Sequence, residues 1–348
     1  MRKLKLVVVG PGLIGKQHIR LINENTQCEL YAIVAPDHDV NHDIASAQNV
    51  PLFHSLDECL DSTHVDGVII SSPNQFHADQ AKLCIEANIP VLIEKPITVS
   101  VAEGETLVRL AGHKNAKVLV GHHRAHSPLL SLARSVINEG RLGRLVTVMG
   151  SAQFYKPAYY FEDGPWRREV GGGPILINLI HEIGNLRSLC GEIAAVQALT
   201  SSAIRDFPVE DTVVTNLIFS NGTLGTFVLS DTAATAKSWE QTSRENPSYP
   251  TYPDEDCYVV TGTEGSLAIP TMRLKYYDKG TTPSWWTPFS EETLDTERYD
   301  PLTCQLDHFV QIIKGACVPL VSAADGLRNL QVTEAIRDSA ATKQIVYV

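Results

Sequence analysis

The residues with the clearest chemical potential begin near the N-terminus, as three closely spaced glycines. Gly10, Gly12 and Gly15 follow the apolar, β-branched segment Leu4–Val9, and a helical pattern starts directly after them. A strand, a tight turn and a helix in this order are the context in which GxGxxG predicts a dinucleotide-binding turn. Gly10 allows the sharp turn, Gly12 lets a pyrophosphate approach the amides of the helix N-terminus, and Gly15 permits close helix packing.

Two further polar motifs follow predicted strands. Ser71-Ser72-Pro73-Asn74-Gln75-Phe76-His77 comes at the end of one expected strand, and Glu94-Lys95-Pro96 comes at the end of the next. Ligands bind at the carboxyl ends of the strands in open α/β sheets. We therefore expect both motifs to contribute to a ligand site.

The elements that position these motifs alternate between strand and helix up to about residue 122. Short apolar strands that alternate with helices form parallel sheets buried on both faces. The sequence thus predicts an α/β fold with a Rossmann dinucleotide-binding domain over residues 1–122. Strands are expected at Leu4–Val9, Glu29–Ala35, Gly67–Ser71, Val91–Ile93 and Lys117–Val120, and helices at Gly15–Asn25, His77–Ala87 and Val101–Lys114.

The pattern changes after Leu145, where longer alternating strands cluster. This clustering predicts a second α/β domain, residues 123–348, built on a large, mostly antiparallel open sheet. Two C-terminal helices, Leu302–Lys314 and Ala323–Thr342, could cover one domain or bridge both. Strands are expected at Val146–Gln153, Ala195–Thr200, Val213–Ser220, Leu224–Ser230, Tyr258–Thr261 and Ser266–Ile269, with a helix at Pro174–Cys190 among them.

The polar stretch Thr235–Asp256 is rich in Ser, Pro and Tyr and predicts a long loop, with a lid as one interpretation.

Composition narrows the class of protein. The chain has 348 residues and a net charge of −11, so it offers no basic face for nucleic acid or an anionic membrane. No apolar run approaches the roughly 20 residues of a transmembrane helix. The charged N-terminal start passes straight into the glycine motif without a signal-peptide cleavage site. Seven scattered cysteines without a CxxC pair indicate reduced, mostly buried thiols and a cytoplasmic protein.

Together these motifs resemble the Gfo/Idh/MocA oxidoreductases, the family of glucose-fructose oxidoreductase and inositol dehydrogenase. The likeness spans nearly the whole chain and implies a Rossmann domain, a nicotinamide cofactor and a small-molecule polyol or sugar substrate. It also rests on Gly121-His122-His123-Arg124, Trp166-Arg167, Gly171-Gly172-Gly173, Gly262-Thr263-Glu264-Gly265-Ser266-Leu267 and Asp325-Gly326-Leu327-Arg328.

The resemblance makes Lys95 the first catalytic candidate. In such enzymes the lysine of Glu-Lys-Pro lies beside the nicotinamide and contacts the hydroxyl that is oxidised. Hydride leaves carbon only as the hydroxyl proton is removed, so a lysine that stabilises or protonates the oxygen suits this chemistry. The alternative is an ordinary surface lysine before a turn at Pro96.

His181 is the second candidate, since it matches the histidine that the family uses as acid/base or substrate-hydroxyl partner. Its apolar helix would otherwise suggest a hydrogen-bonded core residue, but imidazole titrates near neutral pH. Many members carry an Asp four residues earlier, where this chain has Ile177, followed by Asn178. Asn cannot relay a proton, so Lys95 is expected to bear more of the transfer, or the substrate to bind in another orientation.

Arg124, Trp166, Arg167 and Asn185 are further pocket candidates. An aromatic face suits a sugar ring, and arginine donors suit hydroxyls or a carboxylate. Surface packing or a salt bridge is the alternative for each. We expect no metal site, because the cluster His122, His123 and His126 includes no thiol or carboxylate.

The expected cofactor is NAD, with NADP left open. The acidic ribose ligand normally ends the second strand, where Ala35, Pro36 and Asp37 stand; Asp37 is the candidate. No Arg or Lys occurs between Arg20 and Lys82 to meet a 2′-phosphate. The cofactor residues are thus Gly10, Gly12, Leu13, Ile14, Gly15, Asp37, Ser72, Pro73, Asn74, His77, Glu94, Lys95, Trp166 and Arg167, and the substrate residues are Lys95, Arg124, Asn178, His181 and Asn185.

The resemblance implies oxidation of a secondary alcohol, or the reverse, on a sugar, sugar acid or cyclitol. Two alternatives stay open: a dehydrogenase of cyclic dihydrodiols, and a dinucleotide-binding sensor without catalysis. Members often pair through the outer face of the large sheet, so we expect a homo-oligomer, a dimer or tetramer.

Overall fold

The structure, a computed structural model, describes residues 2–62 and 64–348. The chain forms two compact units, each discontinuous in sequence. The first comprises Met1–His126 and Pro301–Leu330, and the second comprises Ser127–Asp300 and Gln331–Val348. Each unit is described by itself.

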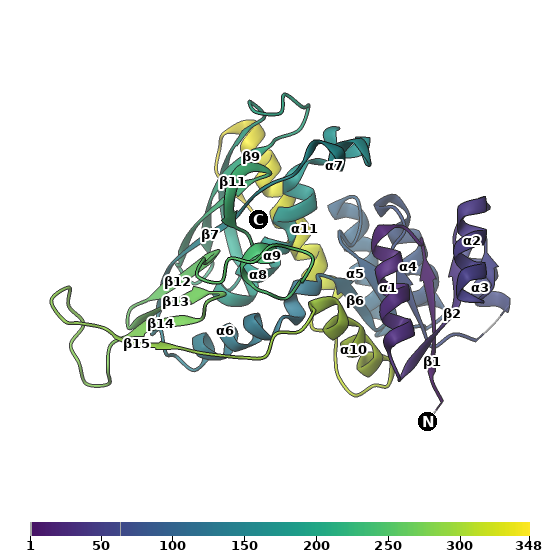
Figure 1. The fold of residues 1–348 in the computed structure, drawn as a ribbon, viewed down its shortest axis with the longest axis horizontal. Coiled ribbons are helices and arrows are strands. Elements are labelled where there is room, and N and C mark those ends of the chain that lie inside the picture. The colour runs from purple at the N-terminus through teal and green to yellow at the C-terminus, as the bar shows by residue number, and fades with distance from the viewer. Residues whose placement is uncertain (1, 63) are drawn as a thin grey trace. The chain divides into compact units, whose positions relative to one another are not determined.

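The first unit contains a six-stranded parallel sheet in the order β3-β2-β1-β4-β5-β6. Its central strands are almost wholly apolar because helices cover both faces; Figure 1 shows these helices around the sheet. The strands are β1 (Leu4–Val9), β2 (Cys28–Val34), β3 (Leu52–Phe53), β4 (Gly67–Ile70), β5 (Val91–Glu94) and β6 (Val118–Gly121), and the helices are α1 (Leu13–Glu24), α2 (Asp39–Gln48), α3 (Leu56–Ser62), α4 (His77–Glu86) and α5 (Val101–Lys114).

A C-terminal segment completes this unit. Helix α10 (Pro301–Ile313) contributes the fully buried Phe309 to the core of the parallel sheet. A Cβ added to Gly67 of β4 would lie 3.2 Å from the Phe309 ring, so the helix packs closely on the strand. The unit around the parallel sheet therefore extends beyond residues 1–122 because its core needs this helix.

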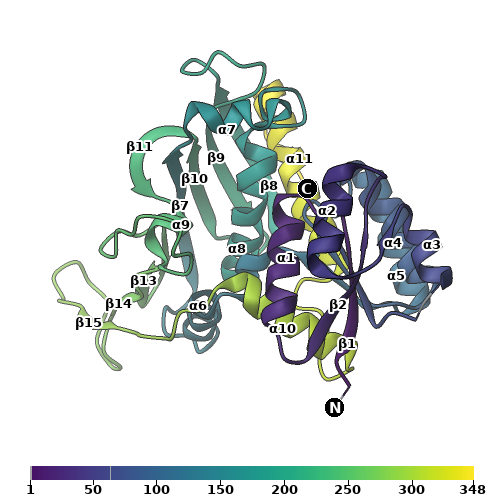
Figure 2. The ribbon, with the colours of Figure 1, turned by 45° about the vertical axis from the view of Figure 1, so that its right-hand side comes forward.

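The second unit contains a mixed, mostly antiparallel ten-stranded sheet, so the predicted fold class is confirmed. Nine strands run in the order β15-β14-β13-β12-β7-β10-β9-β8-β16, and β11 pairs with β7. Only the pairing of β10 with β7, among these described pairs, is parallel. The strands, seen best in Figure 2, are β7 (Leu145–Tyr155), β8 (Ile193–Ser201), β9 (Thr212–Phe219), β10 (Leu224–Ser230), β11 (Thr232–Lys237), β12 (Tyr258–Gly262), β13 (Gly265–Ile269), β14 (Arg273–Tyr276), β15 (Ser290–Thr293) and β16 (Val346–Tyr347).

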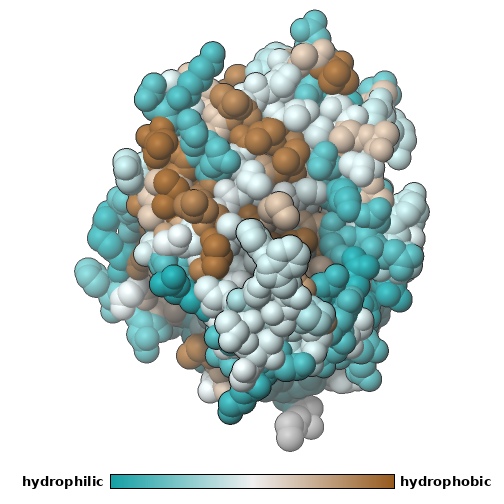
Figure 3. Space-filling view, turned by 90° about the vertical axis from the view of Figure 1, so that its left-hand side faces the viewer, coloured by the Kyte–Doolittle hydropathy of each residue, from teal (hydrophilic) through white to brown (hydrophobic). Residues whose placement is uncertain are grey.

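Helices cover one face of this sheet. Apolar side chains of α6 (Pro128–Asn138), α8 (Ile180–Cys190) and the last part of α11 (Ala323–Thr342) share one core with the sheet. On the opposite face, β-alternation points apolar side chains outward. Five of them are substantially exposed: Met149, Leu199, Val214, Ile218 and Leu224. We call these five residues the outer sheet patch; Figure 3 views the molecule from this side and shows apolar surface gathered there.

The stretch Thr235–Asp256 is anchored over its first half. After β11 it forms the short helix α9 (Trp239–Thr242), and the Trp239 side chain is 3% exposed. Glu245, also buried, accepts hydrogen bonds from Trp239 Nε1 at 2.9 Å and from Ser127 Oγ. The lid interpretation therefore does not suit this half of the loop.

The cysteines match the expectation of reduced thiols. All seven are free and five are buried. Burial raises the pKa of Cys84 and of Cys190 to about 12, which makes these thiols unreactive. Among the described residues, no helix is long and apolar enough to cross a membrane.

Candidate active site

The glycine turn leaves space where a phosphate could approach. Gly10 adopts φ +80°, and a Cβ there would lie 2.6 Å from Ser72 Cα. A Cβ on Gly15 would lie 2.1 Å from the Gly10 oxygen, whereas a Cβ on Gly12 would meet no atom within 4 Å. Gly12 is also the N-cap of α1, beside the exposed Leu13. The open position is thus at the helix N-terminus, where backbone amides bind anions, and the residues fit a dinucleotide.

The end of β4 is tied to this turn and to the end of β5. Ser71 Oγ lies 2.9 Å from the carbonyl oxygens of Val9 and Gly10. The fully buried His77 ring contacts the Ser72 oxygen at 2.9 Å and the Pro96 oxygen at 2.8 Å. Because both ring nitrogens face backbone oxygens, His77 holds the two strand ends in register.

Lys95 directly follows β5 at the same edge of the sheet and is half-buried. Glu94, which precedes it, is buried and lies 2.8 Å from His18 Nε2 of α1. In the neighbouring strand, Gly121 pairs with Glu94, and a short helical turn with His123 and Arg124 follows. Because β5 and β6 end side by side, Lys95 and the turn with His123 and Arg124 follow at the same edge of the sheet.

Two cations, Lys95 and Arg124, act on His123 at this edge. Burial, together with the positive charges of Arg124 and Lys95, holds the pKa of His123 well below its ordinary value. His123 is therefore a neutral imidazole beside two cations near neutral pH. Arg124 itself is 4% exposed, which makes it a buried member of the first unit.

Asp37 follows β2 on the surface. His42 Nε2 lies 2.8 Å from its Oδ1, and this hydrogen bond, with the nearby His54, lowers the pKa of Asp37. Each of these three exposed residues has a nitrogen or oxygen atom that could bind a metal, and these atoms lie within 4.8 Å of one another. In residues 2–62 and 64–348, no other group of three or more His, Cys, Asp or Glu side chains is arranged in this way. Asp37 is thus held as a carboxylate at the end of β2.

His181 lies at the start of α8, directly after a π-helical turn over Ile175–Leu179. Such turns occur frequently at functional sites. The His181 side chain is buried, and Asn178 lies three residues before it in the π-helical turn. Asn178 Oδ1 accepts a hydrogen bond of 2.7 Å from Lys156 Nζ.

Trp166 and Arg167 lie in a short helical turn, Pro165–Arg168. The Arg167 guanidinium stacks over the Tyr160 ring at 4.0 Å and donates to the Tyr160 carbonyl oxygen. A Cβ on Gly172 would lie 2.5 Å from the Trp166 carbonyl oxygen, so the glycine run packs tightly on this turn. Trp166 is 54% exposed and therefore available to a ligand.

Asn185 lies in the core of the second unit, in α8 and four residues after His181. Its Nδ2 donates to Tyr258 Oη at 3.1 Å, and that hydroxyl donates to Glu182. All three residues are buried. The amide of Asn185 therefore links α8 to β12, and its role in the substrate site stays a prediction.

The candidates divide between the two units. The first unit contains the glycine turn, Asp37, Ser72, His77, Glu94, Lys95 and Arg124, and the second contains Asn178, His181, Asn185, Trp166 and Arg167. Sequence reasoning gave His18 and Lys156 no role and considered His123 only within the family motif and as a metal ligand. Lys156 lies three residues beyond the predicted strand end at Gln153 and directly after β7.

Two protein-family models match this chain, each over a different segment. Residues 4–122 match the oxidoreductase family with an NAD-binding Rossmann fold, and residues 130–268 match the GFO/IDH/MocA C-terminal domain. The chain belongs to the Gfo/Idh/MocA oxidoreductase family. It is by this membership an NAD(P)-dependent oxidoreductase with an NAD(P)-binding Rossmann domain.

Individual relatives of this Gfo/Idh/MocA chain are distant. It is 24% identical to the rhizopine catabolism protein MocA of Rhizobium meliloti, over 96% of this chain and 94% of that one. It is 22% identical to inositol 2-dehydrogenase of R. meliloti strain 1021, over 98% of each. The WlbA dehydrogenase of Bordetella pertussis, solved with NADH and UDP-GlcNAcA, aligns with a TM-score of 0.78 and 22% identity, over 100% of this chain and 99% of that chain.

Proposed function

We propose that this protein is a dehydrogenase that transfers a hydride between NAD and a secondary alcohol or ketone of a sugar, sugar acid or cyclitol. The observation that carries the proposal is the placement of Lys95. It follows β5 at the same sheet edge as the open Gly12 position, and the buried Glu94–His18 contact holds its backbone. This placement supports the proposal that Lys95 acts beside the reactive ring of a bound dinucleotide.

Lys95 and His181 divide the proton chemistry in this proposal. A bound nicotinamide would supply the hydride acceptor for oxidation and the hydride donor for reduction. Negative charge develops on the substrate oxygen as its proton is removed in oxidation, or as hydride arrives in reduction, and the Lys95 ammonium stabilises that charge by a charge-assisted hydrogen bond. His181 is the second acid/base group of the proposal, because an imidazole can both take and give a proton. Asn178 cannot carry a proton, so Lys95 bears the larger share.

NAD rather than NADP is supported by Asp37. Its carboxylate, with a pKa lowered by the His42 hydrogen bond, suits the hydroxyls of the adenosine ribose and repels a 2′-phosphate. Among the relatives, inositol 2-dehydrogenase acts on an inositol and WlbA was solved with NADH. We therefore assign a small polyol or sugar substrate to this chain.

Two other functions are kept as alternatives. The apolar residues around His181 would suit a cyclic dihydrodiol, whose ring is largely hydrocarbon. A non-catalytic dinucleotide sensor could dispense with Lys95 and His181, and their joint presence favours catalysis.

A substrate screen separates these functions. Polyols, sugars, sugar acids and dihydrodiols are each incubated with NAD or NADP, and nicotinamide absorbance is followed. Turnover of a sugar, sugar acid or cyclitol with NAD is the expected result. Turnover confined to dihydrodiols would overturn the substrate proposal, and cofactor binding without turnover of any class would favour the sensor.

A further inference from the structure

Three exposed side chains with metal-binding atoms meet at one edge of the parallel sheet of the first unit. Asp37 follows β2, His42 lies near the start of α2, and His54 directly follows β3. Their ligand atoms lie within 4.8 Å of one another. The expectation of no metal site rested on other histidines, at positions 122, 123 and 126.

The backbone that carries these side chains is itself fixed by hydrogen bonds. The N–H of Ala35, directly after β2, donates to the carbonyl oxygen of Phe53, the last residue of β3, at 3.0 Å. The chain therefore leaves both strands at the same edge, which places His54 near the segment after β2. Asn41 Nδ2 donates to the Pro36 oxygen at 2.9 Å and ties this segment to α2.

The distances suit a small cation after minor movements of the side chains. Zn²⁺ binds nitrogen and oxygen ligands tetrahedrally at about 2.0–2.2 Å, so its ligand atoms lie roughly 3.4 Å apart. His42 Nε2 and Asp37 Oδ1 lie 2.8 Å apart, and the ring centroids of His42 and His54 lie 5.9 Å apart. Because all three side chains are exposed, they can adjust without a change in the core. Three protein ligands leave the fourth position to water.

The chemistry of the group selects the type of ion. Two imidazoles and one carboxylate suit zinc and related transition metals, whereas Mg²⁺ and Ca²⁺ prefer oxygen ligands. The hydrogen bond with His42 lowers the pKa of Asp37, which keeps this carboxyl ionised. Asp39 and Asp43 add negative charge in α2, and residues 21–81 contain no Lys or Arg. The local sequence therefore favours a cation.

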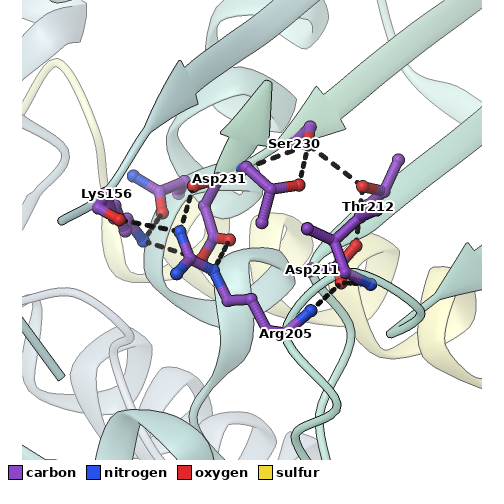
Figure 4. A network of polar contacts seen from close by, with 9 residues as sticks. Lys156, Arg205, Asp211, Thr212, Ser230 and Asp231 are labelled. Atoms are coloured by element: carbon purple, nitrogen blue, oxygen red, sulfur yellow. Dashed lines mark hydrogen bonds and ion pairs between the residues drawn. The ribbon is translucent and has the colours of Figure 1, made fainter. Parts of the chain in front are cut away.

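A second charged cluster, around Arg205 in the second unit, differs in this respect. Figure 4 shows Arg205 with Asp211 and Asp231. Its Nε donates to Asp231 Oδ1 at 2.7 Å, and its backbone N–H donates to Asp211 Oδ2 at 3.0 Å. Both aspartates are 1% exposed. Their carboxylates are hydrogen-bonded inside the protein, so this network stabilises the second unit, whereas the Asp37 carboxylate faces solvent.

We propose that Asp37, His42 and His54 bind a divalent transition-metal ion of the zinc type and that this ion competes with NAD. The competition rests on the proposed function, in which Asp37 binds the adenosine ribose. A carboxylate that ligates a metal shares its charge and lone pairs with the ion, so it is a poor acceptor for the ribose hydroxyls. The ion thus regulates the protein through its affinity for the cofactor.

Zinc binding is measured by isothermal titration calorimetry on the full-length protein, without a polyhistidine tag and without cofactor. The wild type is expected to bind one Zn²⁺ at this site, and His42→Ala and His54→Ala should each weaken that binding by about tenfold or more. His64→Ala is the matched control, since His64 is an exposed histidine 3.8 Å from the Asp66 carboxylate. Wild-type zinc affinity in both site variants, or no zinc binding by the wild type, would overturn the proposal.

A thiol is the competing destination for zinc, because zinc also binds cysteine. Cys317 Sγ lies 3.8 Å from His308 Nδ1. Cys317→Ser should keep the zinc affinity of the wild type. Loss of zinc binding in Cys317→Ser, with binding retained in His54→Ala, would assign the ion to the thiol and refute the proposed site.

Competition is measured by fluorescence titration with NADH while free Zn²⁺ is held at ten times its own Kd for the wild type. The apparent Kd for NADH should rise about tenfold in the wild type and in His64→Ala, because each ligand binds only protein that the other has left free. In His54→Ala the rise should be about twofold or less, since zinc binds this variant more weakly.

The two measurements separate this proposal from the proposed function. Zinc that binds at the site without raising the Kd for NADH would refute the competition. Failure of NADH to bind even without zinc would instead refute the proposed function. The calorimetry contains no cofactor, so it decides the metal site in either case.

Discussion

The His18 imidazole and the Glu94 carboxylate lie 2.8 Å apart in the interior of the first unit, where both side chains are buried. The contact joins α1, which begins at the glycine turn, to the residue that precedes Lys95. It therefore couples the segment proposed to hold the cofactor to the residue proposed to stabilise the reacting oxygen.

Removal of this contact is expected to affect stability and turnover together. His18→Ala leaves a buried carboxylate without its imidazole partner and should lower the free energy of unfolding by about 3 kcal/mol. The turnover number should also fall, because the Lys95 backbone loses its anchor. Urea unfolding and steady-state kinetics measure both effects. His113→Ala, an exposed histidine of α5, is the control; equal stability of the two variants would contradict the prediction.

Gly12 and Gly15 should differ sharply in what they tolerate. Gly12→Ala adds a methyl group in open space, so the unfolding midpoint should stay unchanged while NADH affinity falls by about tenfold or more, because the methyl group occupies the phosphate approach. Gly15→Ala forces a carbon against the Gly10 oxygen and should destabilise by about 2 kcal/mol. Fluorescence titration with NADH and urea unfolding distinguish the two. Normal NADH affinity of Gly12→Ala would contradict the assigned cofactor position.

Lys95→Ala should lower kcat by roughly 10²–10⁴, the usual contribution of a positioned acid or base. NADH affinity should change far less, because the proposed pyrophosphate contacts come from the glycine turn. Lys95→Arg should also fail, since a guanidinium cannot give up its proton. Kinetics on the substrate identified by the screen measure this, with the exposed Lys82→Ala as control. Near-normal turnover by Lys95→Ala would shift the proton transfer to His181.

Glu210 should make stability depend on pH. Its Oε1 accepts the Ile175 backbone N–H at 2.9 Å, and burial raises the pKa of Glu210. A carboxyl whose pKa is higher in the folded than in the unfolded state loses stability as pH rises through the folded pKa. Glu210→Gln keeps the acceptor without the charge, so its melting temperature should exceed that of the wild type near pH 7, with the gain shrinking toward pH 4. The exposed Glu264→Gln is the control. A melting temperature of Glu210→Gln below that of the control near pH 7 would contradict the prediction.

The outer sheet patch predicts self-association. Five apolar side chains, exposed by 37–61%, lie on one sheet face, and such a surface marks an interaction site. We expect a homo-oligomer joined through this face. Val214→Arg, opposite Leu199 on the neighbouring strand of the patch, should weaken association by at least about a hundredfold by burying an unpaired charge. Light scattering measures the mass; the control Val318→Arg alters an exposed valine of the first unit. A monomeric wild type would contradict the prediction.

The bounds of strands and helices were predicted best where the local sequence pattern agrees with the packing. Strand Leu4–Val9 and helix Val101–Lys114 have the predicted bounds, since apolar periodicity alone defines such elements. Strand β3 has only two residues, and α2 buries a single residue, Ala45. Neither leaves a periodic signal, and both were missed.

The site was less accessible to sequence reasoning because its contacts join distant parts of the chain. The partner of Asn185 is Tyr258, 73 residues later, so its helix position alone could not reveal the contact that its amide makes. Strand β7 continues two residues beyond the predicted end at Gln153. That extension places Lys156 directly after the strand. Its Nζ there meets Asn178 Oδ1, a contact between residues 22 positions apart in the sequence.

The discontinuity of the first unit has a consequence for biosynthesis. The side chains of Leu306, Phe309, Val310 and Ile312 fill the core of a sheet that begins at Leu4, so the ribosome must synthesise more than 300 residues before the helix that seals it exists. Until then the N-terminal sheet exposes the apolar surface that α10 will cover, including the neighbourhood of Gly67. A nascent chain of this protein should therefore depend on chaperones late into translation.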